Sequence, residues 1–414
     1  MSESTASKPW QQRMPDDQFD RMRAILEAPS PIGLEGAMTE GVLAPMTEEF
    51  MPAGWKVHRF TGNAGIVIDT APDAKDAFTV MLIGHADKIR LQVRSIGSDG
   101  KIWVNSDSFL PTTLLGEEVL LFSEDPENPG AFRVLDGGTI EGVGAAHFAS
   151  ADLKAGRKGI KAENLFLELQ IHGKEKEEQV KRLGIRSGDP ILLKRPIRRG
   201  FSPDTFFGAY LDNGLGCFVM IEVARLLAEA GGLKNLRFLG AAAAYEEIGR
   251  FGSRVLAQEF RPNVVIGADV SHDLAAAPGV GDKRYTPIAM GSGFSMQSGA
   301  ITSSYLNSLL SRVTVEHDIP VQRVLAGRDT GTDAMAAVLA SIDAAATSVG
   351  FPIRNMHTST EIGHTGDVLA AVHGVFELLR SMDAMNGGAG VSAGDFQQGH
   401  PRLDRADALE HSDG

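Results

Sequence analysis

The sequence predicts an α/β protein with a mixed, mostly parallel sheet sandwiched by helices and an inserted β-rich domain. Two observations carry this prediction. Apolar runs of strand length alternate with helical patterns in the first and last parts of the chain, as expected when helices connect parallel strands. Between these parts, residues 89–196 read almost entirely as short strands and turns.

This change of pattern divides the chain into domains. We expect residues 16–88 and 197–384 to form one α/β domain, and residues 89–196 to form an inserted β-rich domain of ordinary size. Residues 1–15 and 385–414 are polar or rich in small residues, which predicts flexible tails.

The elements before the insert follow from their apolar spacing. A helix is expected to begin at Asp16, because acids suit a helix N-terminus. Residues 29–33, which contain two prolines and a glycine, should end it. A second helix is expected over residues 35–50, interrupted near Pro45. Residues 57–69 alternate as a strand does. The apolar face of the first helix comprises Phe19, Met22, Ile25 and Leu26.

The later elements alternate between strands and helices. Residues 215–227 are apolar nearly all round, which predicts a buried helix. The other helices expected are at 174–183, inside the insert, and at 306–313 and 369–379. The strands expected are at 78–84, 235–243, 263–268, 321–325, 342–349 and 352–356.

Composition limits the partners and the compartment. The net charge of −13 argues against duplex nucleic acid and anionic membranes as partners. The one cysteine, Cys217, excludes an intrachain disulfide and a thiolate zinc cluster. No apolar run approaches the roughly 20 residues that span a membrane. The first residues lack the apolar core of a signal peptide, so a cytoplasmic protein is expected.

Acids and histidines follow several of the expected strands. Ligands in parallel sheets bind beyond the carboxyl ends of the strands, so these side chains are candidates for one common site. Glu246 and Glu247 are especially informative, because adjacent carboxylates at a buried strand end repel each other unless a cation lies between them. The full candidate set is His85, Asp87, Asp212, Glu246, Glu247, Asp269 and His357.

Imidazoles and carboxylates without a thiolate suit zinc, cobalt or manganese in a hydrolytic site. Two such metals can share a carboxylate and activate a water, and a spare acid can serve as general base. Each residue also has a simpler explanation. A lone histidine is more often structural, Asp212 could cap the helix after it, and Asp269 could begin a turn. The metal-site prediction therefore depends on their joint placement.

Eight stretches resemble the tetrahedral (TET), deblocking-type family of dinuclear zinc aminopeptidases, which includes glutamyl aminopeptidases and proteins once labelled cellulases. The resemblance covers about residues 16–382. The stretches are residues 29–35, Ile83-Gly84-His85-Ala86-Asp87, residues 183–190, Tyr210-Leu211-Asp212-Asn213, Tyr245-Glu246-Glu247-Ile248-Gly249, Ala268-Asp269-Val270, Gly331-Thr332-Asp333-Ala334 and Met356-His357-Thr358.

The resemblance implies a role for each candidate. His85 and Asp269 would hold one metal, and Glu247 and His357 would hold the other. Asp212 would bridge both. The two remaining acids would not be ligands: Glu246 would be the general base, and Asp87 would orient the imidazole of His85. The metals would be two divalent ions per chain, zinc or alternatively cobalt or manganese.

Three positions need separate treatment. Lys88 stands where relatives often carry an acid; it could tune the metal site or contact an acidic substrate, and a solvated lysine is the simpler expectation. Gly214 stands where relatives often carry arginine, which puts any support from that arginine in doubt. His364 is expected to be a surface histidine.

The function expected is a metal-dependent aminopeptidase that acts on short peptides. The resemblance further implies self-association through the β-rich insert, into dimers and up to a hollow dodecamer. One alternative is a deacylase or carboxypeptidase on the same metal centre. Another is a metal-binding protein without catalysis, which is considered because Lys88 and Gly214 depart from the residues that relatives often carry. A glycosidase fits less well, because it needs two carboxylates and no metal.

Overall fold

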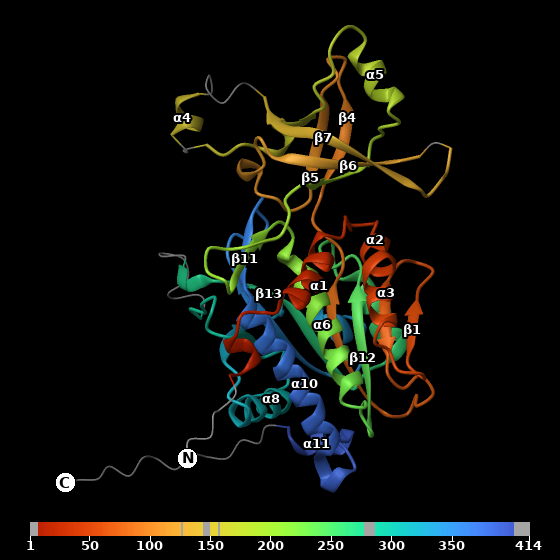
Figure 1. The fold of residues 1–414 in the computed structure, drawn as a ribbon, viewed down its shortest axis with the longest axis vertical. Helices are drawn as coiled ribbons and strands as arrows, with labels where there is room; N and C mark the ends of the chain where they lie inside the picture. The colour runs from red at the N-terminus through yellow and green to blue at the C-terminus, as the bar shows by residue number, and fades with distance from the viewer. Residues whose placement is uncertain (1–6, 126, 144–149, 156–157, 277–285, 401–414) are drawn as a thin grey trace, which may run out of the picture.

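The structure is a computed structural model that describes residues 7–400 except 126, 144–149, 156–157 and 277–285. It confirms the α/β fold with a β-rich insert (Figure 1). One sheet has eight strands, and the pairs β12–β3, β3–β13 and β13–β16 at its centre are parallel. Its strands, in spatial order, are β1 (Lys56–Arg59), β2 (Gly65–Asp69), β12 (Leu236–Ala243), β3 (Phe78–His85), β13 (Val264–His272), β16 (Ala345–Ile353), β14 (Phe294–Gly299) and β15 (Val321–Ala326).

The register of the central strands brings their carboxyl ends to one edge. His85, the last residue of β3, lies beside Ala243, the last residue of β12. On the other side of β3, β13 and β16 pair from Val264 to His272. Because all four strands run in the same direction, residues at or just beyond their carboxyl ends share one edge of the sheet.

Helices cover both faces of this sheet and bury its apolar side chains. On one face lie α1 (Asp16–Glu27), α6 (Leu211–Glu229), α8 (Ser304–Glu316) and α10 (Thr365–Gly388). On the other lie α7 (Phe251–Phe260) and α9 (Ala336–Leu339). The apolar face predicted for α1 is confirmed, because all four of its side chains are buried. The helix α6 is buried nearly all round, as its uniform apolar pattern predicts.

The insert contains a closed barrel at one end of the molecule (Figure 1). Its strands are β4 (Leu91–Ile96), β5 (Ile102–Ser106), β6 (Glu118–Glu124), β7 (Phe132–Gly142), β8 (Leu165–Glu168) and β9 (Pro190–Leu193). The barrel has its own apolar core, and α4 (Ala151–Lys154) and α5 (Lys176–Arg182) lie beside it. A separate small sheet of β10 (Arg198–Arg199), β11 (Thr205–Gly208) and β17 (Glu361–His364) lies between the barrel and the larger domain.

Several elements differ from the sequence prediction. Residues 57–69 are two antiparallel strands, β1 and β2, because the chain turns near Asn63, which has a positive φ of 56°. The second expected helix is divided into α2 (Gly36–Met38), a π-helical turn and α3 (Ala44–Glu48). Pro45 lies in the first turn of α3, directly after the π-helical turn, so the interruption expected near Pro45 falls where the helix changes its hydrogen-bonding pattern. The strands expected at 342–349 and 352–356 are largely one strand, β16.

The segment after residue 385 is more ordered than its composition predicts. Residues 393–398 form α11 (Ala393–Gln398), which begins with a capping box at Ser392. The ring of Phe396 stacks on Phe78 at a centroid distance of 5.6 Å, so this part of the expected tail packs on the domain. The rest of the two expected tails lies partly outside the described residues, which leave out 1–6 and 401–414.

Lys88 is buried, which makes the expectation of a solvated lysine wrong. Its side chain is 1% exposed, and its Nζ donates to the carbonyl oxygens of Leu26, at 2.7 Å, and Ala28. Carbonyls at the C-terminal end of a helix attract a cation, so Lys88 caps α1. Burial lowers the pKa of Lys88 to about 7.

Gly214 and His364 also have structural explanations. A Cβ atom at Gly214 would lie 2.7 Å from Cδ2 of Leu26, so the first turn of α6 packs directly on the end of α1. His364 is the N-cap of α10, and its Nδ1 accepts a hydrogen bond from the backbone N–H of Gly366 at 3.1 Å. Its side chain is 23% exposed, so His364 lies partly at the surface and has a capping role that the sequence did not predict.

We expect Gly214→Ala to destabilise the metal-free protein by about 1–3 kcal/mol, because the added methyl group overpacks the contact with Leu26. Urea unfolding measures the change. Gly36→Ala in α2 is the matched control, since a Cβ there meets nothing within 4 Å. Equal stability of the Gly214→Ala variant and the wild type would contradict the packing described.

Candidate metal centre

The four central parallel strands supply most of the candidate residues. His85 ends β3, Asp269 lies in β13, and His357 follows β16 by four residues. Glu246 and Glu247 lie in the turn after β12, where Tyr245 has a positive φ of 61°. The sheet therefore brings together side chains that are far apart in the sequence.

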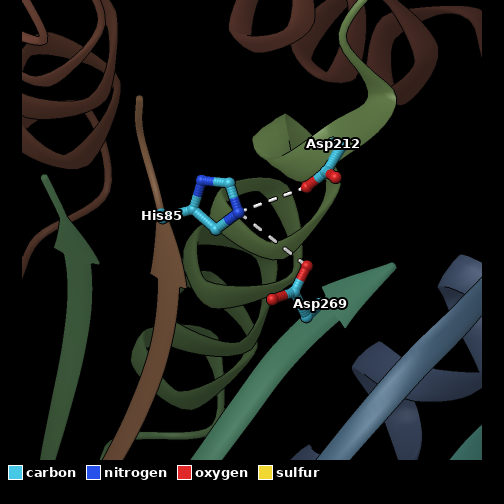
Figure 2. Close-up of side chains that lie close together, drawn as sticks. All are labelled: His85, Asp212 and Asp269. Carbon is cyan, nitrogen blue, oxygen red and sulfur yellow. Dashed lines mark ion pairs between the residues drawn. The ribbon is translucent and has the colours of Figure 1, made fainter. Parts of the chain in front are cut away.

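Asp212 enters the same site from the first turn of α6, which points at the strand ends (Figure 2). Its backbone is not helical, and the Asp212–Asn213 peptide bond is cis. The two carboxylate oxygens of Asp212 contact two different imidazoles. Oδ1 lies 3.2 Å from Nε2 of His85, and Oδ2 lies 3.1 Å from Nε2 of His357.

Two groups of three residues could each hold a metal ion. The first is His85, Asp212 and Asp269, which Figure 2 shows, and the second is Asp212, Glu247 and His357. Within each group, one potential ligand atom from each residue lies within 4.8 Å of the others. Asp212 belongs to both groups. All five residues predicted as ligands are thus brought together.

The donor set fits divalent cations. It consists of imidazole nitrogens and carboxylate oxygens, which zinc, cobalt and manganese accept. Oε1 of Glu247 is buried and has no hydrogen-bond partner among the described residues. Nε2 of His357 lies 3.6 Å from this oxygen, beyond hydrogen-bond distance, so a bound cation would supply a closer partner.

Asp87 lies next to the candidate ligands and contacts two segments that carry them. Its Oδ1 and Oδ2 accept hydrogen bonds from the backbone N–H groups of Glu246, at 3.0 Å, and Glu247, at 3.1 Å. Its Oδ1 also lies 3.5 Å from Nδ1 of His85. The buried carboxylate of Asp87 therefore connects β3 with the turn after β12.

Three acids of the site, Glu246, Glu247 and Asp269, have raised pKa values. Burial raises the pKa of Glu246 to about 8, and the nearby Asp333 and Glu247 carboxylates add to this shift. Burial and the negative charge of Asp212 raise the pKa of Glu247. Burial raises the pKa of Asp269 well above its ordinary value. Without a cation, part of this cluster is therefore protonated at neutral pH.

The histidines and Asp212 stabilise each other's charges. Burial alone would lower the pKa of His357, but Asp212 and Glu247 outweigh it and raise that pKa to about 10. The pKa of His85 is also raised, against burial, by Asp212 and Asp87. Hydrogen bonds from both imidazoles hold the pKa of Asp212 below its ordinary value, although burial opposes this.

Two further buried acids near the site were missed in the sequence. Both oxygens of Asp333 are buried without a hydrogen-bond partner among the described residues, and burial raises its pKa to about 6. Glu361 is 2% exposed, and its carboxylate accepts hydrogen bonds from backbone N–H groups of the ligand-bearing segments. The placement of Asp333 in a matching stretch was the only sequence signal for either residue.

A cavity of about 680 Å³ adjoins the site beyond β13 and β16. Its walls are largely apolar, and Arg354 contributes a cation that is paired with the buried carboxylate of Asp273 at 2.7 Å. The cavity is lined in part by Val270, Gln297, Ile353 and Met356. Because Val270 follows Asp269 directly and Met356 precedes His357, the cavity opens beside the candidate ligands.

Residues 65–373 match the family model described as M42 glutamyl aminopeptidase. The chain belongs to the M42 glutamyl aminopeptidase family. This M42 chain is 29% identical over 308 residues to the lysyl aminopeptidase of Pyrococcus furiosus, a match that covers 73% of this chain and 83% of that relative. The family establishes the chain as a hydrolase of the aminopeptidase class.

Solved structures share the fold. A TET aminopeptidase from a marine sediment Thaumarchaeota archaeon aligns with a TM-score of 0.78 and 20% identity, over 93% of this M42 chain and 99% of that one. A TET1 peptidase of Pyrococcus horikoshii, described as assembling into a tetrahedron or a large octahedral shell, aligns with a TM-score of 0.69 and 18% identity, over 87% and 99% of the two chains. In the part of the chain that the structure describes, no helix is long and apolar enough to cross a membrane.

The raised pKa values predict that metal affinity increases with pH. His85, His357, Glu247 and Asp269 must each be deprotonated to bind a cation, and a raised pKa means that more protons must leave. We expect Co²⁺ to bind more tightly at about pH 8 than at about pH 6, by about tenfold per pH unit for each proton released.

Calorimetric titration of metal-free protein in two buffers with different ionisation heats measures both the affinity and the number of protons released. An affinity that is independent of pH, with no proton release, would show that these side chains are not the ligands.

Proposed function

We propose that the protein is a dinuclear metal-dependent aminopeptidase that releases N-terminal residues from short peptides. The observation that carries this proposal is the position of Asp212, whose two oxygens face the imidazoles of two separate ligand groups. In this proposal His85 and Asp269 hold one cation, Glu247 and His357 hold the other, and Asp212 bridges them. Two bound divalent cations would polarise the scissile carbonyl and acidify a water.

Glu246 is proposed as the general base. It belongs to neither ligand group, yet its Oε2 lies 3.8 Å from Nε2 of His85, so its carboxylate reaches the reaction space. Its other oxygen, Oε1, lies 3.6 Å from Nε of Arg250, which restrains the side chain. An acid in this position can take a proton from water and deliver it to the leaving amine. Asp87 supports the base through its bond to the backbone N–H of Glu246.

The cavity next to Asp269 and His357 is proposed to receive the first side chain of the peptide. Lys88 and Gly214 give no support to the alternative of a metal-binding protein without catalysis. The ammonium group of Lys88 faces backbone carbonyls, and Gly214 packs on Leu26, so both residues have structural roles. We also propose that residues 16–88 and 197–384 form the catalytic domain, and that the insert, residues 89–196, serves self-assembly. The cytoplasmic location and the absence of nucleic acid and membrane partners remain proposals from composition.

A panel of aminoacyl anilides tests the activity. Protein that contains two metals per chain should cleave them, and Glu246→Gln should retain both metals while the turnover falls by about 100- to 10,000-fold. Glu229→Gln is the matched control, because Glu229 lies at the far end of α6 and, among the residues that the structure describes, forms its ion pair with Arg225. Its activity should equal that of the wild type.

N-acylated amino acids and peptides with a free C-terminus complete the panel. Turnover of these substrates together with inert anilides would replace the aminopeptidase by a deacylase or carboxypeptidase. Full metal occupancy without turnover of any amide would indicate a metal-binding protein without catalysis.

The resemblance to TET peptidases predicts an assembly of two to twelve copies in solution. Light scattering coupled to size-exclusion chromatography measures the mass directly, and a multiple of the chain mass of 44.2 kDa is expected. A mass equal to one chain would remove the assembly role proposed for the insert, without affecting the metal centre.

A further inference from the structure

Glu361 contacts two of the three segments that supply the second ligand group, those of Asp212 and His357. Its Oε1 accepts a hydrogen bond from the backbone N–H of His357 at 2.9 Å. Its Oε2 accepts from the backbone N–H of Leu211 at 2.7 Å and of Asp212 at 3.3 Å. These two segments are about 145 residues apart in the sequence. A single buried carboxylate thus joins the backbones of two candidate ligands.

The position of Glu361 follows from the small sheet. Glu361 begins β17 and lies opposite Gly208 in β11, so the residues that follow β11 pass beside its side chain. On its other side, Arg354 and Ile362 exchange backbone hydrogen bonds of 3.0 and 3.2 Å, which close the loop that contains His357. The carboxylate of Glu361 therefore lies between the loop and the start of α6.

The contacts among the three residues form a closed circuit. Glu361 holds the backbone N–H groups of Asp212 and His357, while the side chains of those two residues meet at 3.1 Å. Tyr210 and His357 both have positive φ values, 66° and 61°, which cost energy in residues other than glycine. The three backbone hydrogen bonds that the carboxyl group of Glu361 accepts offset part of this cost.

We propose that Glu361 is a positioning residue that sets the distance between Asp212 and His357 and thereby builds the second metal site. This inference rests on the proposed two-metal function. His85 and Asp269 lie in β3 and β13, where the sheet itself fixes them, and among the described residues the carboxyl group of Glu361 accepts hydrogen bonds only from the segments of Asp212 and His357. Loss of Glu361 should therefore affect the second site more than the first.

Glu361→Gln tests the proposal with almost no change in shape. A glutamine has one acceptor oxygen, so its NH₂ group must face the N–H of either His357 or Leu211, and one side of the circuit opens. Metal-free, full-length protein is titrated with CoCl₂ in a calorimeter. The wild type should bind two equivalents, and in Glu361→Gln the second should bind about 10- to 100-fold more weakly.

Glu361→Asp separates position from charge, and it also carries the test if the glutamine variant does not fold. Aspartate keeps the negative charge but is one methylene shorter, so it cannot reach both segments. The proposal predicts that this variant, too, binds the second metal more weakly than the wild type does. Normal binding by Glu361→Asp beside weak binding by Glu361→Gln would overturn the proposal, because charge alone would then account for the effect.

Asp383→Asn is the matched control. The carboxylate of Asp383 also accepts three backbone N–H bonds, from Lys234, Asn235 and Leu236, but it lies at the amino end of β12, opposite the site. This variant should bind both metals as the wild type does. Loss of the second metal here as well would overturn the proposal, because general loosening of the fold would explain both results.

Two other results are decisive. Equal affinity for the second metal in the wild type and Glu361→Gln overturns the positioning role and leaves the two-metal centre intact. Wild-type protein that binds fewer than two equivalents contradicts the proposed two-metal centre itself, and the inference about Glu361 falls with it.

Discussion

Repulsion between buried carboxylates is the constraint on which the site depends. Asp212, Glu247 and Asp269 lie within two overlapping groups only a few ångströms wide, and the nearby carboxylate of Asp333 raises the pKa of Glu246. Two like charges about 4 Å apart repel by about 4 kcal/mol at the effective dielectric constant of a protein surface. A few such pairs equal the whole stability of a typical domain, about 5–15 kcal/mol. Protons or cations must therefore accompany these acids in the folded state.

The sheet holds some of the candidate ligands, and loops and turns hold the others. His85 and Asp269 are parts of registered central strands, so their separation is set by the sheet. Glu246, Glu247 and His357 lie in loops, and Asp212 lies in a non-helical turn. Two buried carboxylates hold these loops and this turn in place through hydrogen bonds to their backbones. Asp87 bonds the turn after β12, and Glu361 bonds the loop after β16 together with the start of α6.

Most ligand candidates were predictable because they follow apolar runs that read as strands, and parallel strands share a carboxyl edge; Asp212 instead precedes the buried helix α6. Glu361 was not predictable in this way. Its role depends on the pairing of β17 with β11 across about 150 residues of sequence, which no local pattern encodes. The turn near Asn63 was missed because apolar alternation continues through it into β2. The sequence around α11 is rich in small residues, so it did not predict that the ring of Phe396 would anchor this helix to the domain.

Lys88 and Gly214 are better understood as a pair than as two separate departures. Both meet Leu26 at the C-terminal end of α1: Nζ of Lys88 binds its carbonyl, and Gly214 leaves room for its side chain. The backbone of Lys88 also pairs with the loop that follows, through bonds of 3.0 Å to the carbonyl of Ser30 and 3.2 Å from the N–H of Ile32.

An acid at position 88 would face two carbonyl oxygens and be repelled, and an arginine at position 214 would displace Leu26. The two positions therefore constrain each other through the end of α1. Because Lys88 follows Asp87 and Gly214 lies two residues after Asp212, this helix end packs beside both the β3 terminus, which supplies His85, and the start of α6, which supplies Asp212.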